Sequence, residues 1–274
     1  MSYNEVFAGR KIAISTSENP DMAALGLSDE HLRDAMVEIA RHLLALGARI
    51  SFGGDLRANG FSHLLFELVS RHRRDADAGD RCLGVTNYLA WPVHLSMTLD
   101  DLDGALTDLL DTADLVCLEL DGSHQSMDVR RHLQPRQPTD AEWSAGLTAM
   151  RSVMLSESDA RIVLGGRVDQ YKGVMPGIAE EALLSLRAQQ PLFVMGGFGG
   201  CARDIAETLG LVEPWAVVRG AWPGREAMKA FNFTSLKNGL TQQENATLAR
   251  TPHVDQAITL ILRGLNNVHA VVPT

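Results

Sequence analysis

Leu192-Phe193-Val194-Met195 runs directly into Gly196-Gly197-Phe198-Gly199-Gly200, and a helix-like segment follows. The same order of apolar run, glycine turn and helical pattern occurs twice more, at Ile50 to Arg57 and from Arg161 to Arg167 onward. In an open parallel sheet the carboxyl ends of the strands face one crevice, where glycines let backbone N–H groups approach a ligand closely. The three turns therefore predict an α/β fold with a nucleotide pocket at the carboxyl ends of its strands.

The rest of the chain alternates in the same way, which is typical of a doubly wound, mainly parallel sheet. We expect strands at 11–15, 49–52, 82–86, 115–120, 161–164 and 191–195. We expect helices from Ser28 through Leu43, at 61–71, from Ala141 through Met154, and at 176–187, 201–209 and 254–265. The segments 71–80 and 121–140 are predicted to be surface connections, and the pattern is less regular after Val212.

Composition limits the function classes. A chain of 274 residues that is 45% hydrophobic is long enough to bury the core of one α/β domain, with two lobes as the alternative. The net charge of -9 argues against duplex nucleic acid and anionic membranes as partners. Three cysteines without C-x-x-C spacing indicate neither a disulfide framework nor a zinc site, and no signal peptide or membrane span is evident. We therefore expect a cytoplasmic protein without a metal.

Two common catalytic motifs are missing from the sequence. It contains neither the P-loop G-x-x-x-x-G-K-[ST] nor the nucleophile elbow G-x-S-x-G. ATP hydrolysis and α/β-hydrolase chemistry are therefore not expected, and no cofactor is predicted.

The first glycine turn carries charged side chains beside Gly53 and Gly54. Asp55 is suited to ribose hydroxyls, and the guanidinium of Arg57 is suited to phosphate. In the alternative interpretation, Asp55 caps a helix and Arg57 is solvated. Both interpretations place this turn at the carboxyl end of a strand.

The second turn, Gly165-Gly166-Arg167, precedes a helix with Glu180 and Glu181 near its start. Carboxylates at a helix start are favoured by the helix dipole, which explains at least one of them. The other interpretation is that one glutamate faces the crevice, where it binds ribose or acts as an acid or base at a glycosidic carbon. Adjacent helical residues point about 100° apart, so only one of the two is expected to face the pocket.

The third turn has the densest glycine content, and Arg203 follows it. So many glycines are costly unless the backbone needs a close approach or a positive φ, so we predict phosphate contact at Gly197, Phe198, Gly199 and Gly200. Cys201 is either a reactive thiol at a helix start or, as we favour without a histidine partner nearby, a packing residue. Ser15 and Ser17, at the end of the first strand, contact the ligand or form an ordinary turn.

These turns, in this order, resemble the SLOG superfamily. This Rossmann-like group includes lysine-decarboxylase-like phosphoribohydrolases, the nucleotide-sensing domain of TRPM-type channels and the sensor domain of Thoeris antiphage effectors. The resemblance covers about Lys11 to Gly210, with Gly165-Gly166, Glu180-Glu181 and Gly197 to Gly200 matching best. The phosphoribohydrolase branch carries P-G-G-x-G-T-x-x-E, whereas this chain has Pro176-Gly177-Ile178-Ala179-Glu180-Glu181.

The resemblance implies a single nucleotide-binding domain over 1–274, with a less regular extension at 212–274. It implies a sensor for an NAD-derived or ADP-ribose-like ligand in antiphage signalling, with a homo-oligomeric state and a separate effector protein. Asp55 and Glu180 or Glu181 would contact ribose, and Arg57, Arg167 and Arg203 would contact phosphate. The alternatives are a nucleoside 5'-monophosphate N-glycosidase with Glu180 or Glu181 as catalytic carboxylate, and a scaffold that binds no nucleotide.

Overall fold

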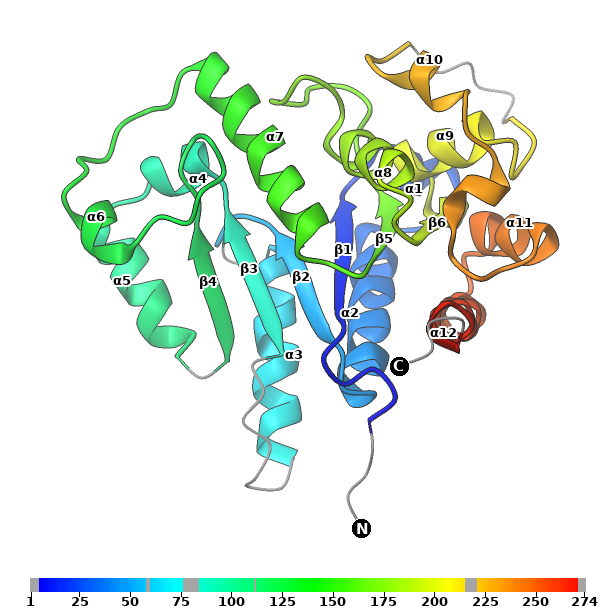
Figure 1. Ribbon diagram of the computed structural model, residues 1–274, viewed down its shortest axis with the longest axis horizontal. Helices are drawn as coiled ribbons and strands as arrows, with labels where there is room; N and C mark the ends of the chain where they lie inside the picture. The colour runs from blue at the N-terminus through cyan, green and yellow to red at the C-terminus, as the bar shows by residue number, and fades with distance from the viewer. Residues whose placement is uncertain (1–4, 58–59, 76–83, 111, 215–220, 271–274) are drawn as a thin grey trace. The chain divides into compact units, whose positions relative to one another are not determined.

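The computed structural model describes residues 5–57, 60–75, 84–110, 112–214 and 221–270, without the side chains of 72–75 and 270. Six strands form a parallel sheet in the order β4-β3-β2-β1-β5-β6 (Figure 1). Their bounds are β1 Lys11–Ser17, β2 Arg49–Gly53, β3 Val85–Leu89, β4 Ala113–Cys117, β5 Ala160–Gly165 and β6 Leu192–Met195. The predicted α/β, Rossmann-like, doubly wound parallel sheet is therefore confirmed.

The strand order places a topological switch point between β1 and β5. The chain proceeds outward from β1 through β2, β3 and β4, and then returns to the other side of β1 with β5 and β6. In open α/β sheets, ligands bind in the crevice outside the carboxyl ends of the strands at such a switch point. The register pairs Ser17 with Gly165 there, so two predicted site residues lie side by side.

The chain divides into two compact units, the first comprising 1–11 and 43–158 and the second 12–42 and 159–274. The helices of the first unit are α3 Phe61–Asp75, α4 Trp91–Leu95, α5 Leu99–Asp108, α6 Met127–Arg131 and α7 Asp140–Ser156. Within it, α7 contacts β2, β3 and α4, and α3 contacts β3. The capping box of Thr139 and Glu142 explains why α7 begins where it does.

A buried arginine, Arg130, is the centre of a hydrogen-bond network inside the first unit. Arg130 is fully buried and donates hydrogen bonds to His94 Nδ1 at 3.2 Å and to the carbonyl oxygens of His94, Met97 and Leu133. The other ring nitrogen of His94, Nε2, lies 2.9 Å from the carbonyl oxygen of Leu118. Burial, and then the nearby Arg130 charge, lower the pKa of His94 to about 4.

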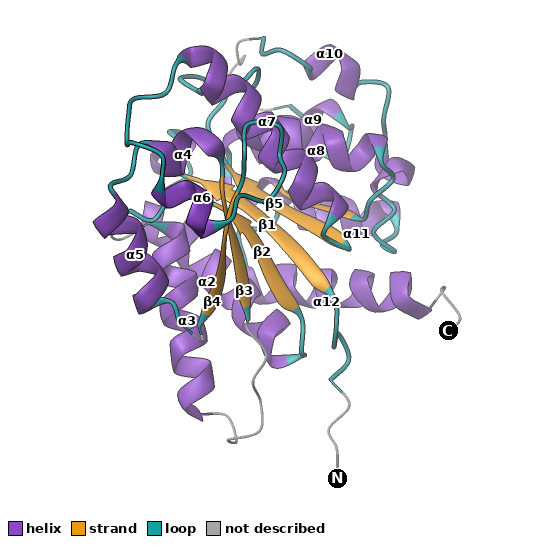
Figure 2. Cartoon of the chain, turned by 60° about the vertical axis from the view of Figure 1, so that its left-hand side comes forward, coloured by secondary structure: helices purple, strands orange, loops and turns teal. Residues whose placement is uncertain are grey.

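The second unit contains β1, β5 and β6 and a large cluster of buried apolar residues. Its remaining elements are α1 Asp21–Ala24, α2 Asp29–Ala45 except for its last turn, α8 Gly177–Arg187, η1 Gly196–Phe198, α9 Gly200–Thr208, α10 Arg225–Met228, η2 Phe233–Leu236, α11 Gln242–Arg250 and α12 Val254–Ala270. Within it, α8 and α9 contact β5 and β6, and α11 contacts β6 and η1 (Figure 2). Cys201 is buried in this cluster, as predicted for a packing cysteine.

Several predicted boundaries were wrong. β3 ends at Leu89 rather than at 86, and β4 lies at Ala113–Cys117 rather than at 115–120. Residues 82 and 83 of the predicted strand lie outside the described part of the chain. The predicted loop 121–140 contains α6, and its start is held by a bridge between Leu118 and His124. Short or polar helices were missed as well, namely α1, α4, α5, α10 and α11.

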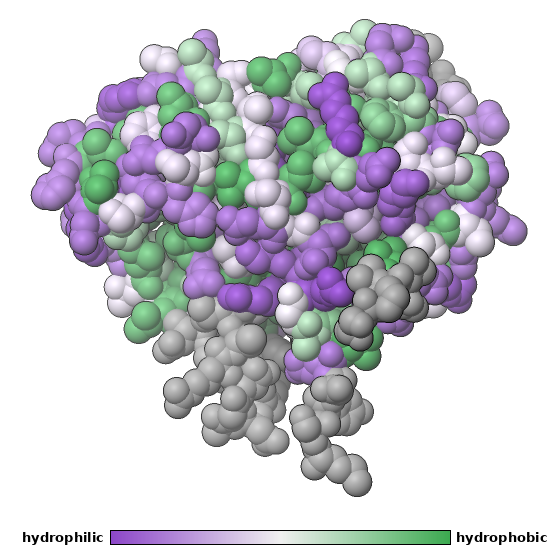
Figure 3. Space-filling model, viewed as in Figure 1, coloured by the Kyte–Doolittle hydropathy of each residue, from purple (hydrophilic) through white to green (hydrophobic). Residues whose placement is uncertain are grey.

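The surface shows no broad apolar face in the view of Figure 3, where hydrophobic residues are interspersed with hydrophilic ones. Among the described residues, no helix combines the length and the apolar character that crossing a membrane requires.

Candidate functional site

The second and third glycine turns meet in the second unit. The N–H of Cys201 donates to the carbonyl oxygen of Gly166 at 2.8 Å. Gly200 has a φ of 65°, and a Cβ built on it would lie 2.4 Å from that same oxygen. Only glycine tolerates both conditions. The carboxyl ends of β5 and β6 are therefore joined by direct backbone contact at the predicted ligand edge.

The start of α9 is occupied by side chains from the segment after β1. The N–H of Gly200 donates to Oδ2 of Asp21 at 2.7 Å, and the Asn19 side-chain amide donates to the carbonyl oxygen of Phe198 at 3.2 Å. The first two N–H groups of α9 thus have acceptors within the protein. The phosphate contact predicted at Gly199 and Gly200 stays a prediction, and a phosphate there would replace Asp21.

Gly197 allows the backbone of another segment to lie close to the third turn. A Cβ built on it would lie 2.1 Å from the carbonyl oxygen of Thr251 and 2.9 Å from that of Arg250. The connection between α11 and α12 therefore lies directly on the third turn. The close packing of Thr251 explains why residue 197 is a glycine. The number of glycines in the third turn is therefore not by itself evidence for a phosphate-binding site.

A pocket of about 210 Å³ lies beside this contact, within the second unit. Its lining residues are two arginines, a glycine and three apolar residues: Leu25, Leu27, Gly197, Arg203, Arg250 and Pro252. Two predicted ligand residues, Gly197 and Arg203, are thereby brought together. The lining comes from the segment after α1, from the third turn with α9, and from the end of α11.

The three predicted phosphate-binding arginines each lie near a carboxylate. Nε of Arg57 is 2.6 Å from Asp55, Nη2 of Arg167 is 3.8 Å from Glu18, and Nε of Arg203 donates to Glu207 at 2.8 Å. The side chains of Arg57 and Arg167 are 81% and 52% exposed, whereas that of Arg203 is 10% exposed. Arg203 also donates to the carbonyl oxygen of Glu213 at 2.8 Å. Arg203 is thus the most buried of the three.

The first turn belongs to the first unit. Cβ atoms built on Gly53 and Gly54 would lie 2.7 Å from the sulfur of Met154 and 2.5 Å from Oγ of Ser62. Asn87 is buried, accepts a hydrogen bond from Ser62 and donates to the carbonyl oxygen of Gly54 at 3.2 Å. This turn is therefore packed and held by hydrogen bonds, and the ligand roles of Asp55 and Arg57 stay predictions.

The two glutamates of α8 are both buried. Glu181 Oε1 lies 3.4 Å from Nη1 of Arg161, and the same nitrogen donates to Oγ of Ser15 at 2.8 Å. Arg161 is fully buried, so Glu181 and Ser15 supply its surroundings with a carboxylate and a hydroxyl. This network explains Glu181 and Ser15 without a ligand. Ser17 accepts the Gly166 N–H on its carbonyl oxygen at 2.7 Å, which fixes the turn after β5.

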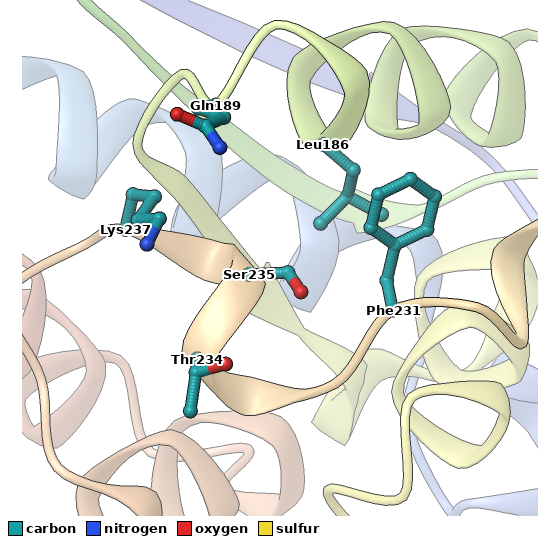
Figure 4. A pocket seen from close by; sticks show the side chains of 6 residues that line it. All are labelled: Leu186, Gln189, Phe231, Thr234, Ser235 and Lys237. Carbon is teal, nitrogen blue, oxygen red and sulfur yellow. The ribbon is translucent and has the colours of Figure 1, made fainter.

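A second, smaller pocket of about 120 Å³ lies elsewhere in the second unit. Figure 4 shows its six lining side chains, which come from the end of α8 and from η2 and its neighbours: Leu186, Gln189, Phe231, Thr234, Ser235 and Lys237. Gln189 lies between α8 and the start of β6, so this pocket is at the amino end of a strand. That is the edge opposite to the one where ligands of such sheets bind.

The sequence analysis did not predict several residues of the pocket and the turn: Asp21, Leu25, Leu27, Arg250 and Pro252. A helix signal was present before Arg250, because Thr241 and Glu244 form a capping box at the start of α11. The contact of Asp21 with Gly200 joins residues 179 apart in the chain, and no local pattern reports it. No group of three or more metal-binding side chains occurs among the residues that the structure describes.

The parallel sheet, its switch point and the glycine turns after β5 and β6 define a Rossmann-like α/β protein with a potential ligand edge. Residues 6–232 match the family model described as SLOG cluster2. The match spans most of the chain, so the chain belongs to the SLOG cluster2 family, and SLOG domains are nucleotide-related sensor or enzyme domains. No curated protein matches the sequence.

Proposed function

We propose that this chain is a sensor domain that binds an NAD-derived or ADP-ribose-like nucleotide at the carboxyl ends of β5 and β6. The observation that carries the proposal is the pocket beside the third turn, which has Gly197 and Arg203 in its lining. Membership of the SLOG family supports a nucleotide-type ligand for this edge.

The size of the pocket suits part of such a ligand. Pockets that bury a whole drug-sized molecule measure about 300 to 1,000 Å³. A volume of about 210 Å³ fits a phosphate with its ribose or a base, and the rest of an ADP-ribose-like molecule would lie along the turns after β1 and β5. Those turns contain Ser17, Gly165, Gly166 and Arg167, which keep their proposed ligand roles.

Arg203 is suited to the anionic portion. Its guanidinium is held by Glu207 and by the carbonyl oxygen of Glu213, so little side-chain entropy remains to be lost on binding. A guanidinium on a partly apolar wall also attracts phosphate more strongly than one in open solvent.

The sensor is favoured over the N-glycosidase by the position of Glu181. A catalytic carboxylate has to reach the glycosidic carbon or its attacking water, whereas Glu181 is buried against Arg161. In the sensor, ligand binding would be passed on through a homo-oligomer or to a separate effector protein. Light scattering with and without ligand tests that part of the proposal.

A thermal-shift screen against AMP, ADP-ribose, cyclic ADP-ribose isomers and NAD tests the function, with chromatography of each ligand after incubation. A raised melting temperature with intact ligand is the result expected of the sensor. Release of the free base would instead make the protein a glycosidase, and Glu180→Gln or Glu181→Gln should then abolish product formation. No shift with any of the ligands would contradict nucleotide binding.

A further inference from the structure

The pocket of the second unit has one guanidinium that nothing within the described residues neutralises. Arg250, in the last turn of α11, is exposed and forms no ion pair with any residue that the structure describes. Arg203, by contrast, lies against Glu207. The negative charge of Glu207 offsets the positive charge of Arg203. The net positive charge beside the pocket is therefore that of Arg250.

The backbone that carries Arg250 is well anchored. The N–H of Thr251 donates to the carbonyl oxygen of Thr247 at 2.9 Å, and its Oγ1 accepts from the N–H of His253 at 3.1 Å. The close approach to Gly197 holds this corner against the third turn. The attachment point of the Arg250 side chain is therefore fixed beside the pocket.

The other pocket walls suit the apolar part of a ligand. Leu25, Leu27 and Pro252 line the same space as the guanidiniums. Leu25 and Leu27 are half-buried, so they offer apolar surface to a sugar or base that carries the phosphate. A phosphate attached to a sugar or base therefore fits this lining better than a free inorganic ion does.

We propose that Arg250 binds a phosphate group of the nucleotide and is a specificity-determining residue of this pocket. The inference rests on the proposed function and deepens it by assigning the phosphate to this arginine. Arg250 lies after residue 232, where the family match ends, so this recognition comes from a segment outside the matched region.

Calorimetric titration of the full chain with ADP-ribose, AMP and adenosine tests the assignment. Arg250→Ala should weaken the binding of ADP-ribose and AMP by about tenfold or more, because one charge-assisted hydrogen-bond pair is lost. Arg250→Lys should fall between wild type and Arg250→Ala, since it keeps the charge but loses the planar fork. Adenosine, which has no phosphate, should bind all variants alike.

Arg187→Ala is the matched control, because Arg187 is an exposed arginine in the last turn of α8 and is not part of the pocket lining. It should leave all affinities within about twofold. If the wild type binds but Arg250→Ala binds ADP-ribose equally well, the role of Arg250 is overturned and the proposed function stands. Equal weakening for adenosine would also overturn the phosphate assignment. A wild type that binds none of the probes would overturn the proposed function, and the inference with it.

Discussion

The carboxylate of Asp21 accepts a hydrogen bond from the backbone N–H of Gly200 at 2.7 Å, linking the segment after β1 to the first residue of α9. The start of a helix has unsatisfied N–H groups and the positive end of its dipole, so it attracts anions. Here an internal carboxylate occupies that position. A ligand anion at the α9 N-terminus would therefore have to displace Asp21, whereas one at the arginines of the proposed pocket would not.

Replacing Asp21 should measure the strength of this contact. Asp21→Ala removes the hydrogen bond between the Asp21 carboxylate and the Gly200 N–H, and the free energy of unfolding should fall by about 1 to 2 kcal/mol. Asp21→Asn keeps a side-chain oxygen and should lose less. Urea denaturation measures both, with Asp169→Ala, an exposed residue, as control. An Asp21→Ala variant as stable as the wild type would show that the contact contributes nothing.

Gly197→Ala should be strongly destabilising, because its Cβ would lie 2.1 Å from the carbonyl oxygen of Thr251 and backbone would have to move. We expect a loss of about 2 to 3 kcal/mol. Gly104→Ala is the control, because its Cβ would meet nothing within 4 Å in helix α5, and it should stabilise by about 0.5 to 1 kcal/mol. Equal stability of the two variants in urea denaturation would refute the close approach.

Stability should depend on pH through His94. Its pKa is lowered to about 4 in the folded state, below the value of about 6.5 for an unfolded chain. The unfolded state therefore binds the proton first as the pH falls. The stabilisation is complete above about pH 6.5 and is lost toward pH 4, by about 3 kcal/mol in all. Histidine NMR signals measured from pH 7 to 4 give the check: a His94 signal that titrates near 6.5 would contradict the burial.

Glu181→Gln should cost about 3 kcal/mol of stability, because it leaves the fully buried Arg161 without this carboxylate. Glu38→Gln removes the partner of Arg41 in an exposed pair and should cost at most about 1 kcal/mol. Denaturation of both variants provides the comparison. A harmless Glu181→Gln that abolishes release of a free base would instead assign Glu181 a catalytic role.

Much of the fold could be predicted from local patterns. The apolar run at Leu192–Met195, the glycines after it and the helix that follows all lie within a short window, so both elements were found correctly. The predicted strand at 82–86 ended before β3 does, because Thr86 and Asn87 are polar although both are buried. Helix α5 was missed although Thr98 caps it and its first turn is acidic, because Leu102 alone among its residues is buried and the apolar stripe is narrow.

The site was less predictable, because its contacts join distant parts of the chain. The third turn is rich in glycine partly because Thr251 and Asp21 pack against it, and neither neighbour can be read from the turn itself. The local sequence likewise gives no sign that Arg250 lines the same pocket as Arg203. Residue types thus predicted that the glycine turns lie at the carboxyl ends of the strands, whereas the arrangement of the pocket depends on tertiary packing.

Hydrogen–deuterium exchange with and without saturating ADP-ribose tests the central claim most directly, because it locates the ligand as well as detecting it. The account predicts slower exchange in peptides that cover 196–203 and 248–252, with little change in those that cover 61–71 of the first unit. Unchanged exchange throughout, or protection confined to other segments, would contradict a nucleotide site at the carboxyl end of β6.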